Sequence, residues 1–257
     1  MTRTSIKDIE KLLRGLGLQK NDRVMVHSSL FSLGIIENGI DGFHQALLNV
    51  IGDEGTIIVP AFTHSYRQGK IFDLLQTPSE KSLGMYSEYI RKKSSSVRSA
   101  DPLFSMAASG PDAHELMIRT SINCFGTGSV YERLFEANVR YLAIGITYST
   151  GLSAFMHLEK LANVPYRKDL FLTGRSINAE GQEYDDSAIH FARDENEFYQ
   201  TGRTNREPMG VMLEDAKVSL AANFKNGRHF ALLSKPFEQF VLSKLENDPM
   251  MMFELNK

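Results

Sequence analysis

The chain has little cysteine, no tryptophan and no strong excess of charge of either sign. Cys124 is the single cysteine among 257 residues, which excludes an intrachain disulfide and a multi-thiolate metal site. The 29 Lys and Arg residues and 31 Asp and Glu residues leave a formal net charge of −2, so the net charge gives no electrostatic reason to bind nucleic acid. We expect a cytoplasmic protein with no bound metal and no nucleic-acid partner.

Long apolar runs are also absent. Nowhere do about 18 apolar residues follow one another, as a membrane-spanning helix would require. The segment from Met1 to Lys7 lacks an apolar stretch of signal-peptide length. With 42% hydrophobic residues, the chain can still bury a full core. These features predict a globular protein that is neither secreted nor membrane-bound.

Apolar strands alternate with amphipathic helices in the first part of the chain. Segments 22–28, 56–60 and 139–146 are almost continuously apolar, which is typical of a sheet covered on both faces. The spacing of apolar residues predicts helices over 6–16 and 41–51. Strand, helix and strand in close succession form the βαβ pattern. We therefore predict an α/β fold with a central, mostly parallel or mixed sheet covered by helices.

No internal repeat or low-complexity linker divides the chain, so we expect a single domain over residues 1–257. Residues 63–98 carry polar loops and one predicted helix, and we expect them to form a flap or excursion over the strand ends. Within 168–257 the pattern is weaker, with a hairpin predicted around 179–182 and a helix over 236–246. A homo-oligomer is compatible with this organisation.

An imidazole and a carboxylate lie near the start of the helix predicted over 152–163. A neutral imidazole, whose ordinary pKa is about 6.5, can remove a proton at neutral pH. A neighbouring carboxylate can hold the ring in one tautomer and stabilise the imidazolium that forms. His157 and Glu159 therefore suggest a general base, and an ordinary helix N-terminus with a hydrogen-bonded His and a dipole-favoured Glu is the alternative.

A small-residue loop follows the first strand. Adjacent residues of a strand point to opposite faces, so His27 cannot activate Ser28, and without a Gly-x-Ser-x-Gly turn a hydrolase is disfavoured. We expect the backbone N–H groups and hydroxyls of residues 27–30 to meet an anionic or amide-bearing ligand. A plain strand-to-helix connection is the alternative. Arg98 could fork onto a phosphate, although Walker and dinucleotide-binding motifs are absent.

The order of the motifs resembles that of the aminoglycoside 3-N-acetyltransferase family. The resemblance covers residues 20–170, and its main motifs are His27-Ser28-Ser29-Leu30, Gly52-Asp53-Glu54-Gly55-Thr56, Pro60-Ala61-Phe62-Thr63, Arg98-Ser99 with Pro102 and Ser105, Gly128-Ser129, His157 with Glu159, and Val164-Pro165-Tyr166-Arg167. The resemblance implies a single α/β domain that transfers an acyl group from acetyl-coenzyme A, or another acyl-coenzyme A, to the amine of an amino sugar.

Carried onto this chain, the resemblance implies that His157 deprotonates the attacking amine and that Glu159 orients it. Members of the family commonly have this His and Glu three residues apart, whereas here they are two apart. Two residues turn a helix by about 200°, which opposes direct pairing. A second departure is Asp101 before Pro102, where many members carry His. The residues expected along the coenzyme A path are His27, Ser28, Ser29, Leu30, Arg98 and Ser105, and those expected at the acceptor are Thr63, His64, Arg203 and Arg206.

Two classes of acceptor fit the resemblance. A nucleotide-linked amino sugar should meet basic side chains, which the loop 202–206 offers in Arg203 and Arg206. Positive charge there would repel a polycationic aminoglycoside, so the sequence favours the nucleotide-linked acceptor. Aminoglycoside resistance is the alternative function, and a non-catalytic binder of coenzyme A or nucleotides is a further one. The carboxylates that could receive a polycation are Asp185, Asp186, Asp194, Glu195 and Glu197.

Overall fold

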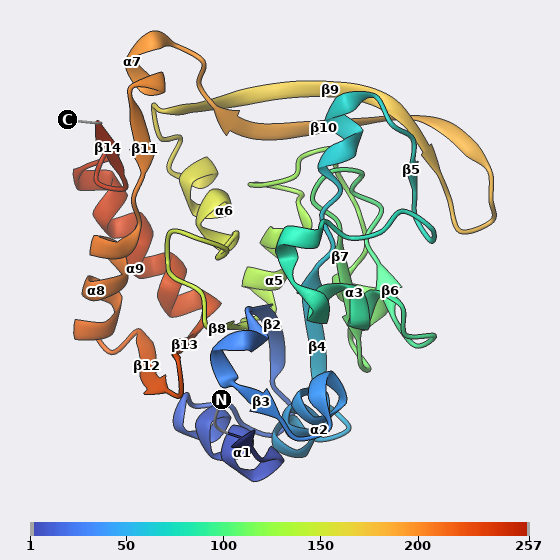
Figure 1. The fold of residues 1–257 in the computed structure, drawn as a ribbon. Helices are drawn as coiled ribbons and strands as arrows, with labels where there is room; N and C mark the ends of the chain where they lie inside the picture. The colour runs from blue at the N-terminus through green and yellow to red at the C-terminus, as the bar shows by residue number, and fades with distance from the viewer. Residues whose placement is uncertain (1–2, 256–257) are drawn as a thin grey trace.

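The computed structural model describes residues 3–255, and a seven-stranded mixed sheet lies at its centre (Figure 1). The strand order is β12-β13-β8-β2-β4-β7-β6, in which β8, β2 and β4 are parallel and the two strands at either edge are antiparallel to their neighbours. The predicted α/β fold is confirmed. The strands are β2 (Arg23–Ser28), β4 (Thr56–Pro60), β6 (Val97–Arg98), β7 (Met106–Ser109), β8 (Arg140–Ile144), β12 (Ser219–Phe224) and β13 (Gly227–Leu233).

Helices cover both faces of this sheet, because successive side chains of each strand point to opposite faces. Val24 and Val26 of β2 pack in one apolar cluster with three helices, α1 (Ile6–Gly15), α2 (Gly39–Ile51) and α3 (Met85–Arg91). Met25 between them packs in a second cluster on the other face. That cluster includes residues from α5 (Val130–Glu136), α6 (Ala154–Leu161), α8 (Glu207–Asp215) and α9 (Ser234–Asn247).

The predicted helix over 6–16 forms as α1 because its start is capped twice. The Ser5 side chain accepts the Asp8 N–H, and the Asp8 carboxylate accepts the Ser5 N–H. The remaining elements are short. They are α4 (Ala113–Leu116), α7 (Glu197–Gln200), the 3₁₀ helices η1 (Leu30–Leu33), η2 (His64–Gln68) and η3 (Lys81–Leu83), and the strands β1 (Arg3–Thr4), β3 (Ile35–Ile36), β5 (Phe72–Asp73), β11 (Gly202–Thr204) and β14 (Phe253–Leu255).

A long ribbon of two strands, β9 (Arg167–Ile177) and β10 (Glu183–Arg193), arches across the top of the molecule in Figure 1, and β5 pairs with the end of β9. The hairpin predicted around 179–182 is its tip. The ribbon is anchored where Arg119 pairs with Asp186 at 2.8 Å and where the Tyr66 hydroxyl donates to the Asp186 carbonyl. None of the helices formed by residues 3–255 is long and apolar enough to span a membrane.

Candidate functional site

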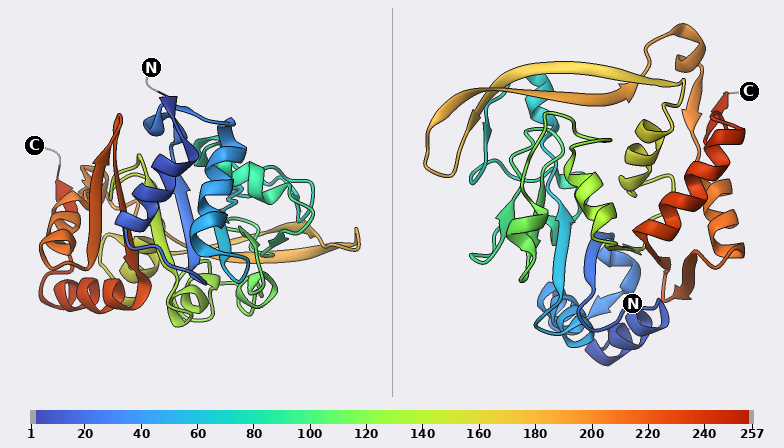
Figure 2. Two further views of the ribbon diagram at one scale, coloured as in Figure 1. Left: turned by 90° about the horizontal axis from the view of Figure 1, so that it is seen from below. Right: turned by 180° about the vertical axis from the view of Figure 1, so that it is seen from behind.

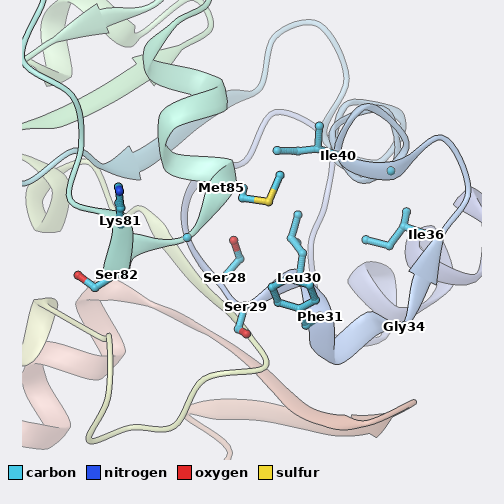
Figure 3. A pocket seen from close by; sticks show the side chains of 12 residues that line it. Ser28, Ser29, Leu30, Phe31, Gly34, Ile36, Ile40, Lys81, Ser82 and Met85 are labelled. Carbon is cyan, nitrogen blue, oxygen red and sulfur yellow. The ribbon is translucent and has the colours of Figure 1, made fainter. Parts of the chain in front are cut away.

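A pocket of about 380 Å³ opens at the carboxyl end of β2, and we call it the β2-end pocket. Its walls come from the end of β2, η1, β3, the start of α2 and the junction of η3 with α3. Leu30, Ile40 and Met85 point into it from three of these elements (Figure 3). The complete lining is Ser28, Ser29, Leu30, Phe31, Gly34, Ile36, Gly39, Ile40, Lys81, Ser82, Gly84 and Met85.

The wall opposite β2 depends on a glycine. Gly84 has a φ of +83°, and a Cβ atom built there would lie 2.7 Å from the carbonyl oxygen of Ser28. Only a residue without a side chain permits this approach. The backbone N–H of Ser29 donates to the Ile144 carbonyl, which keeps the loop aligned with β8. The chain from Lys81 to Met85 is therefore held directly against the end of the central strand.

The pocket suits a ligand that has an apolar or amide-bearing arm and an anionic end. Its lining is largely apolar, with hydroxyls from Ser28 and Ser29. Lys81 lies at the rim, exposed and without an ion-pair partner among the described residues. None of the described residues that line the pocket is a His, Asp or Glu. The pocket can therefore hold a ligand but supplies no general base of its own.

His27 does not line this pocket, contrary to the sequence prediction. Its ring is buried on the other side of β2, and Nε2 lies 3.0 Å from Ser153 Oγ. The Tyr131 hydroxyl donates to the same Ser153 oxygen at 2.6 Å. Burial lowers the pKa of His27 to about 3, so the ring is neutral at physiological pH. His27 thus belongs to a buried polar network that joins β2 to the start of α6.

Arg98 and Ser105 make hydrogen bonds within the fold, and their contact with coenzyme A stays a prediction. Arg98 donates to the carbonyls of Thr77 at 2.5 Å and Ala61 at 2.7 Å, and to Ser105 Oγ at 3.1 Å. Ser105 Oγ in turn donates to the Ala61 carbonyl at 2.6 Å. Burial lowers the pKa of Arg98 to about 9. The guanidinium holds the segment around Thr77 to the end of β4.

Arg98→Lys should lower the free energy of unfolding by about 2 kcal/mol, because an ammonium cannot reproduce hydrogen bonds made in a planar fork. Urea denaturation followed by circular dichroism would measure the loss. Arg175→Lys is the matched control, since Arg175 is exposed and makes surface ion pairs only. If Arg98→Lys had the same urea midpoint as Arg175→Lys, the hydrogen bonds of the Arg98 guanidinium would contribute nothing to the free energy of unfolding.

His157 faces away from the β2-end pocket, toward α5 and α9. Its Nδ1 accepts the Gly126 N–H at 3.1 Å, so in the neutral ring the proton resides on Nε2. Burial lowers the pKa of His157 to about 3. The lone pair that would accept a proton from an amine is therefore already occupied, and the ring is only 1% exposed. In this geometry the neutral ring has no free lone pair, and the general-base role of His157 stays a prediction from the resemblance.

Glu159 does not orient His157 either, because the two side chains leave α6 on different sides, as their spacing predicted. Its carboxylate is fully buried, 2.9 Å from Arg206 Nη2 and 2.6 Å from Arg167 Nε. The Tyr166 hydroxyl donates to it at 3.2 Å. Glu159 therefore joins α6 to the chain before α8 and to the start of β9. The sequence shows the Tyr166-Arg167 motif, but nothing in it identifies Glu159 as the partner of these two residues.

The residues expected to bind the acceptor substrate do not form one cluster of unpaired side chains. Arg206 is buried against Glu159, and exposed Arg203 lies 3.5 Å from Glu254. Thr63 is buried and donates to the Pro102 carbonyl at 2.6 Å. His64 is exposed beside the rings of Phe62 and Phe104. Of the acidic residues, Asp186 is anchored by Arg119 and Asp194 is paired with Lys168 at 2.9 Å.

Comparison with known proteins gives one consistent result. The family model described as "Aminoglycoside 3-N-acetyltransferase" matches residues 25–239. Aminoglycoside N(3)-acetyltransferase III of Salmonella sp is 27% identical over 179 residues, a match that spans 63% of this chain and 62% of that protein, which is less than two thirds of its length.

Solved structures share the fold over nearly the whole chain. Aminoglycoside acetyltransferase AAC(3)-Xa has a TM-score of 0.84 at 23% identity, covering 95% of this chain and 93% of its own. A structure described as AAC-IIIb binary with CoASH has a TM-score of 0.80 at 19% identity, and the match covers 96% of this chain and 97% of that chain. A mutant of AAC(3)-IVa in complex with a gentamicin has a TM-score of 0.79 at 20% identity, and the match covers 98% of this chain and 92% of that chain.

Proposed function

The chain belongs to the aminoglycoside 3-N-acetyltransferase family, and we propose that it transfers an acetyl group from acetyl-coenzyme A to an amine of an aminoglycoside. The observation that carries the proposal is the β2-end pocket, which is lined by Ser28, Ser29 and Leu30, three of the residues that the resemblance implies for coenzyme A. A structural relative described as binary with CoASH has the same fold.

Each part of the pocket matches a part of coenzyme A. The pantetheine arm is apolar with two amides, which suits the walls formed by Leu30, Ile40 and Met85. The phosphates are anionic, and Lys81 places an unpaired ammonium at the rim of the pocket formed by the described residues. Attack on the thioester creates an oxyanion, and the lining of the pocket offers the hydroxyls of Ser28, Ser29 and Ser82 as donors. The amine itself must lose its proton before it attacks.

An aminoglycoside is a better acceptor candidate than the nucleotide-linked sugar that the sequence favoured. A preference for nucleotide-linked sugars required Arg203 and Arg206 to border the acceptor. Arg206 instead neutralises buried Glu159, and Arg203 lies beside Glu254. The positive charge that would repel a polycation is therefore largely compensated. Relatives with this fold include one described in complex with a gentamicin.

Thiol release from acetyl-coenzyme A tests the proposal. The acceptors to compare are gentamicin, glucosamine and a nucleotide-linked amino sugar, each at the same concentration. We expect gentamicin to give the fastest release. Turnover of the nucleotide-linked sugar alone would overturn the choice of acceptor. Coenzyme A binding without thiol release for any acceptor would instead identify a non-catalytic binder.

Met156 lies three residues before Glu159, which is the spacing at which members of the family commonly carry the His that the resemblance assigns to His157 in this chain. It is half-buried, and three residues place it about 60° from Glu159 around the helix. A thioether cannot take a proton from an amine at neutral pH. We expect Met156→His to raise the turnover number by about 100-fold, the lower end of what a general base contributes.

The matched control is Met156→Leu, which keeps the volume of the side chain without adding a base and should leave turnover unchanged. Thiol release at saturating acetyl-coenzyme A and gentamicin measures both variants. Equal turnover of the His and Leu variants would show that this position does not reach the attacking amine.

A further inference from the structure

Two hydrogen bonds connect α2 to α3 beside the β2-end pocket, and we call them the α2–α3 hydrogen bonds. The Tyr89 hydroxyl donates to Asp41 Oδ1 at 2.6 Å, and the Tyr86 hydroxyl oxygen lies 2.9 Å from His44 Nδ1. In each helix the two residues are three positions apart, so they lie on one face of that helix. The left-hand view of Figure 2 shows α3 next to α2.

The direction of the hydrogen bond between Tyr86 and His44 follows from burial. Tyr86 is 1% exposed, and burial raises the pKa of its hydroxyl, which therefore keeps its proton. Burial, and then the charge of Lys93, lower the pKa of His44 to about 4, so the ring is neutral at pH 7. A neutral imidazole can accept at Nδ1, and Tyr86 is then the donor. Without His44, this buried hydroxyl would lose the partner that residues 3–255 give it.

Aromatic packing surrounds both hydrogen bonds. The Tyr86 ring packs edge to face against Phe43 at 4.9 Å and nearly parallel to Tyr89 at 5.8 Å between ring centres. Lys93 Nζ lies 4.6 Å from the centre of the Tyr89 ring. Apolar contact is not directional, whereas a hydrogen bond favours a narrow range of distances and angles. The two hydroxyls therefore fix the separation of α2 and α3 more closely than ring packing does.

The residues next to these contacts line the β2-end pocket. Ile40 precedes Asp41 in α2, Met85 precedes Tyr86 in α3, and the side chains of Ile40 and Met85 point into the pocket (Figure 3). On the other side of Met85, Gly84 lies against the end of β2. One wall of the pocket thus belongs to α2 and another to α3. The space between Ile40 and Met85 depends on how far apart the two helices are held.

We propose that Tyr86 and Tyr89 are positioning residues, whose hydroxyls hold the β2-end pocket in the shape that binds the donor. The inference rests on the proposed function, because acetyl-coenzyme A is the ligand of this pocket. Neither tyrosine lines the pocket, so each acts through its helix. A pocket that already has its bound shape loses less conformational entropy when the ligand enters. The hydroxyls therefore raise the affinity for the donor and leave the chemical step unchanged.

The double variant Tyr86→Phe with Tyr89→Phe tests this role, because it removes both hydroxyls and keeps both rings. We expect the Kd of the full chain for acetyl-coenzyme A to rise at least about fivefold, equivalent to about 1 kcal/mol. Isothermal titration measures the Kd. Turnover at saturating acetyl-coenzyme A and gentamicin should stay within about twofold of the wild type, since only binding of the donor is weakened.

Tyr148→Phe is the matched control. The Tyr148 hydroxyl bonds Glu214 and Ser219, and none of these three residues lines the β2-end pocket. This variant should lower the free energy of unfolding without changing the Kd for acetyl-coenzyme A. An equal Kd for the double variant and Tyr148→Phe would refute the positioning role and leave the α2–α3 hydrogen bonds a structural role only.

Asp41 supplies a second test from the other helix. Asp41 is exposed, so its variants should fold. Asp41→Asn keeps an acceptor oxygen for the Tyr89 hydroxyl and should bind acetyl-coenzyme A as the wild type does. Asp41→Ala should raise the Kd as much as Tyr89→Phe alone, and equal Kd values for Asp41→Ala and Asp41→Asn would contradict the inference. A wild-type protein that does not bind acetyl-coenzyme A would overturn the proposed function as well.

Discussion

Ser28→Phe is expected to raise the Kd for acetyl-coenzyme A by at least about 100-fold, equivalent to about 2.7 kcal/mol. Ser28 is the last residue of β2, and its side chain points into the β2-end pocket toward Met85 (Figure 3). An aromatic ring in that place would occupy the space between Leu30 and Met85. The thioester arm would then have no room beside the central strand.

Ser28→Ala separates the steric effect from the loss of the hydroxyl. The Ser28 hydroxyl makes no hydrogen bond within residues 3–255, so the alanine variant should fold normally and retain coenzyme A binding. Isothermal titration with acetyl-coenzyme A measures both variants. If Ser28→Phe bound acetyl-coenzyme A as tightly as Ser28→Ala, the β2-end pocket would not be the donor site.

Glu159→Ala is expected to lower the free energy of unfolding by about 3–5 kcal/mol, because two buried guanidiniums lose the carboxylate that compensates them. Arg206 and Arg167 both contact Glu159, and the Glu159 side chain is fully buried. Removing one partner of a buried ion pair leaves the other charge without solvent or counterion. The loss should appear as a lower urea midpoint and a lower Tm.

The control is Glu183→Ala, which removes a carboxylate from a surface ion pair with Arg175. An exposed pair contributes at most about 1 kcal/mol, so this variant should stay close to the wild type. A Glu159→Ala protein as stable as Glu183→Ala would mean that Arg206 and Arg167 find other partners, and that Glu159 is not the link between α6, β9 and the chain before α8.

The central strands could be predicted from the sequence because burial on both faces leaves an unbroken apolar run, as in β2, β4 and β8. The long ribbon could not be predicted at its full length. Much of β9 and the first part of β10 are exposed, so their side chains carry no clear alternation. Strand β12 was not predicted because it is an edge strand with exposed Leu220. Strand β13 was not predicted either, although its residues His229 to Leu232 are buried.

For the candidate site, features set by position in the fold could be predicted, whereas contacts between residues far apart in the chain could not. Ser28, Ser29 and Leu30 line the pocket as expected because the end of a central parallel strand is a topological position. The roles of Arg98 and Arg206 depended on partners far along the chain, such as the Ala61 carbonyl and Glu159, which no local pattern reveals. The spacing of His157 and Glu159 indicated that they diverge, but not which of them faces which helix.

Turnover of His157→Phe is the measurement that tests most directly where acyl transfer takes place. Because His157 lies outside the β2-end pocket, we expect turnover with acetyl-coenzyme A and gentamicin to fall by less than about tenfold, well short of the loss of a general base. The free energy of unfolding should fall by about 1–3 kcal/mol, because the Gly126 N–H loses its acceptor. A loss of turnover of about 10²–10⁴ with unchanged stability would contradict the structure-based assignment and restore His157 as the general base.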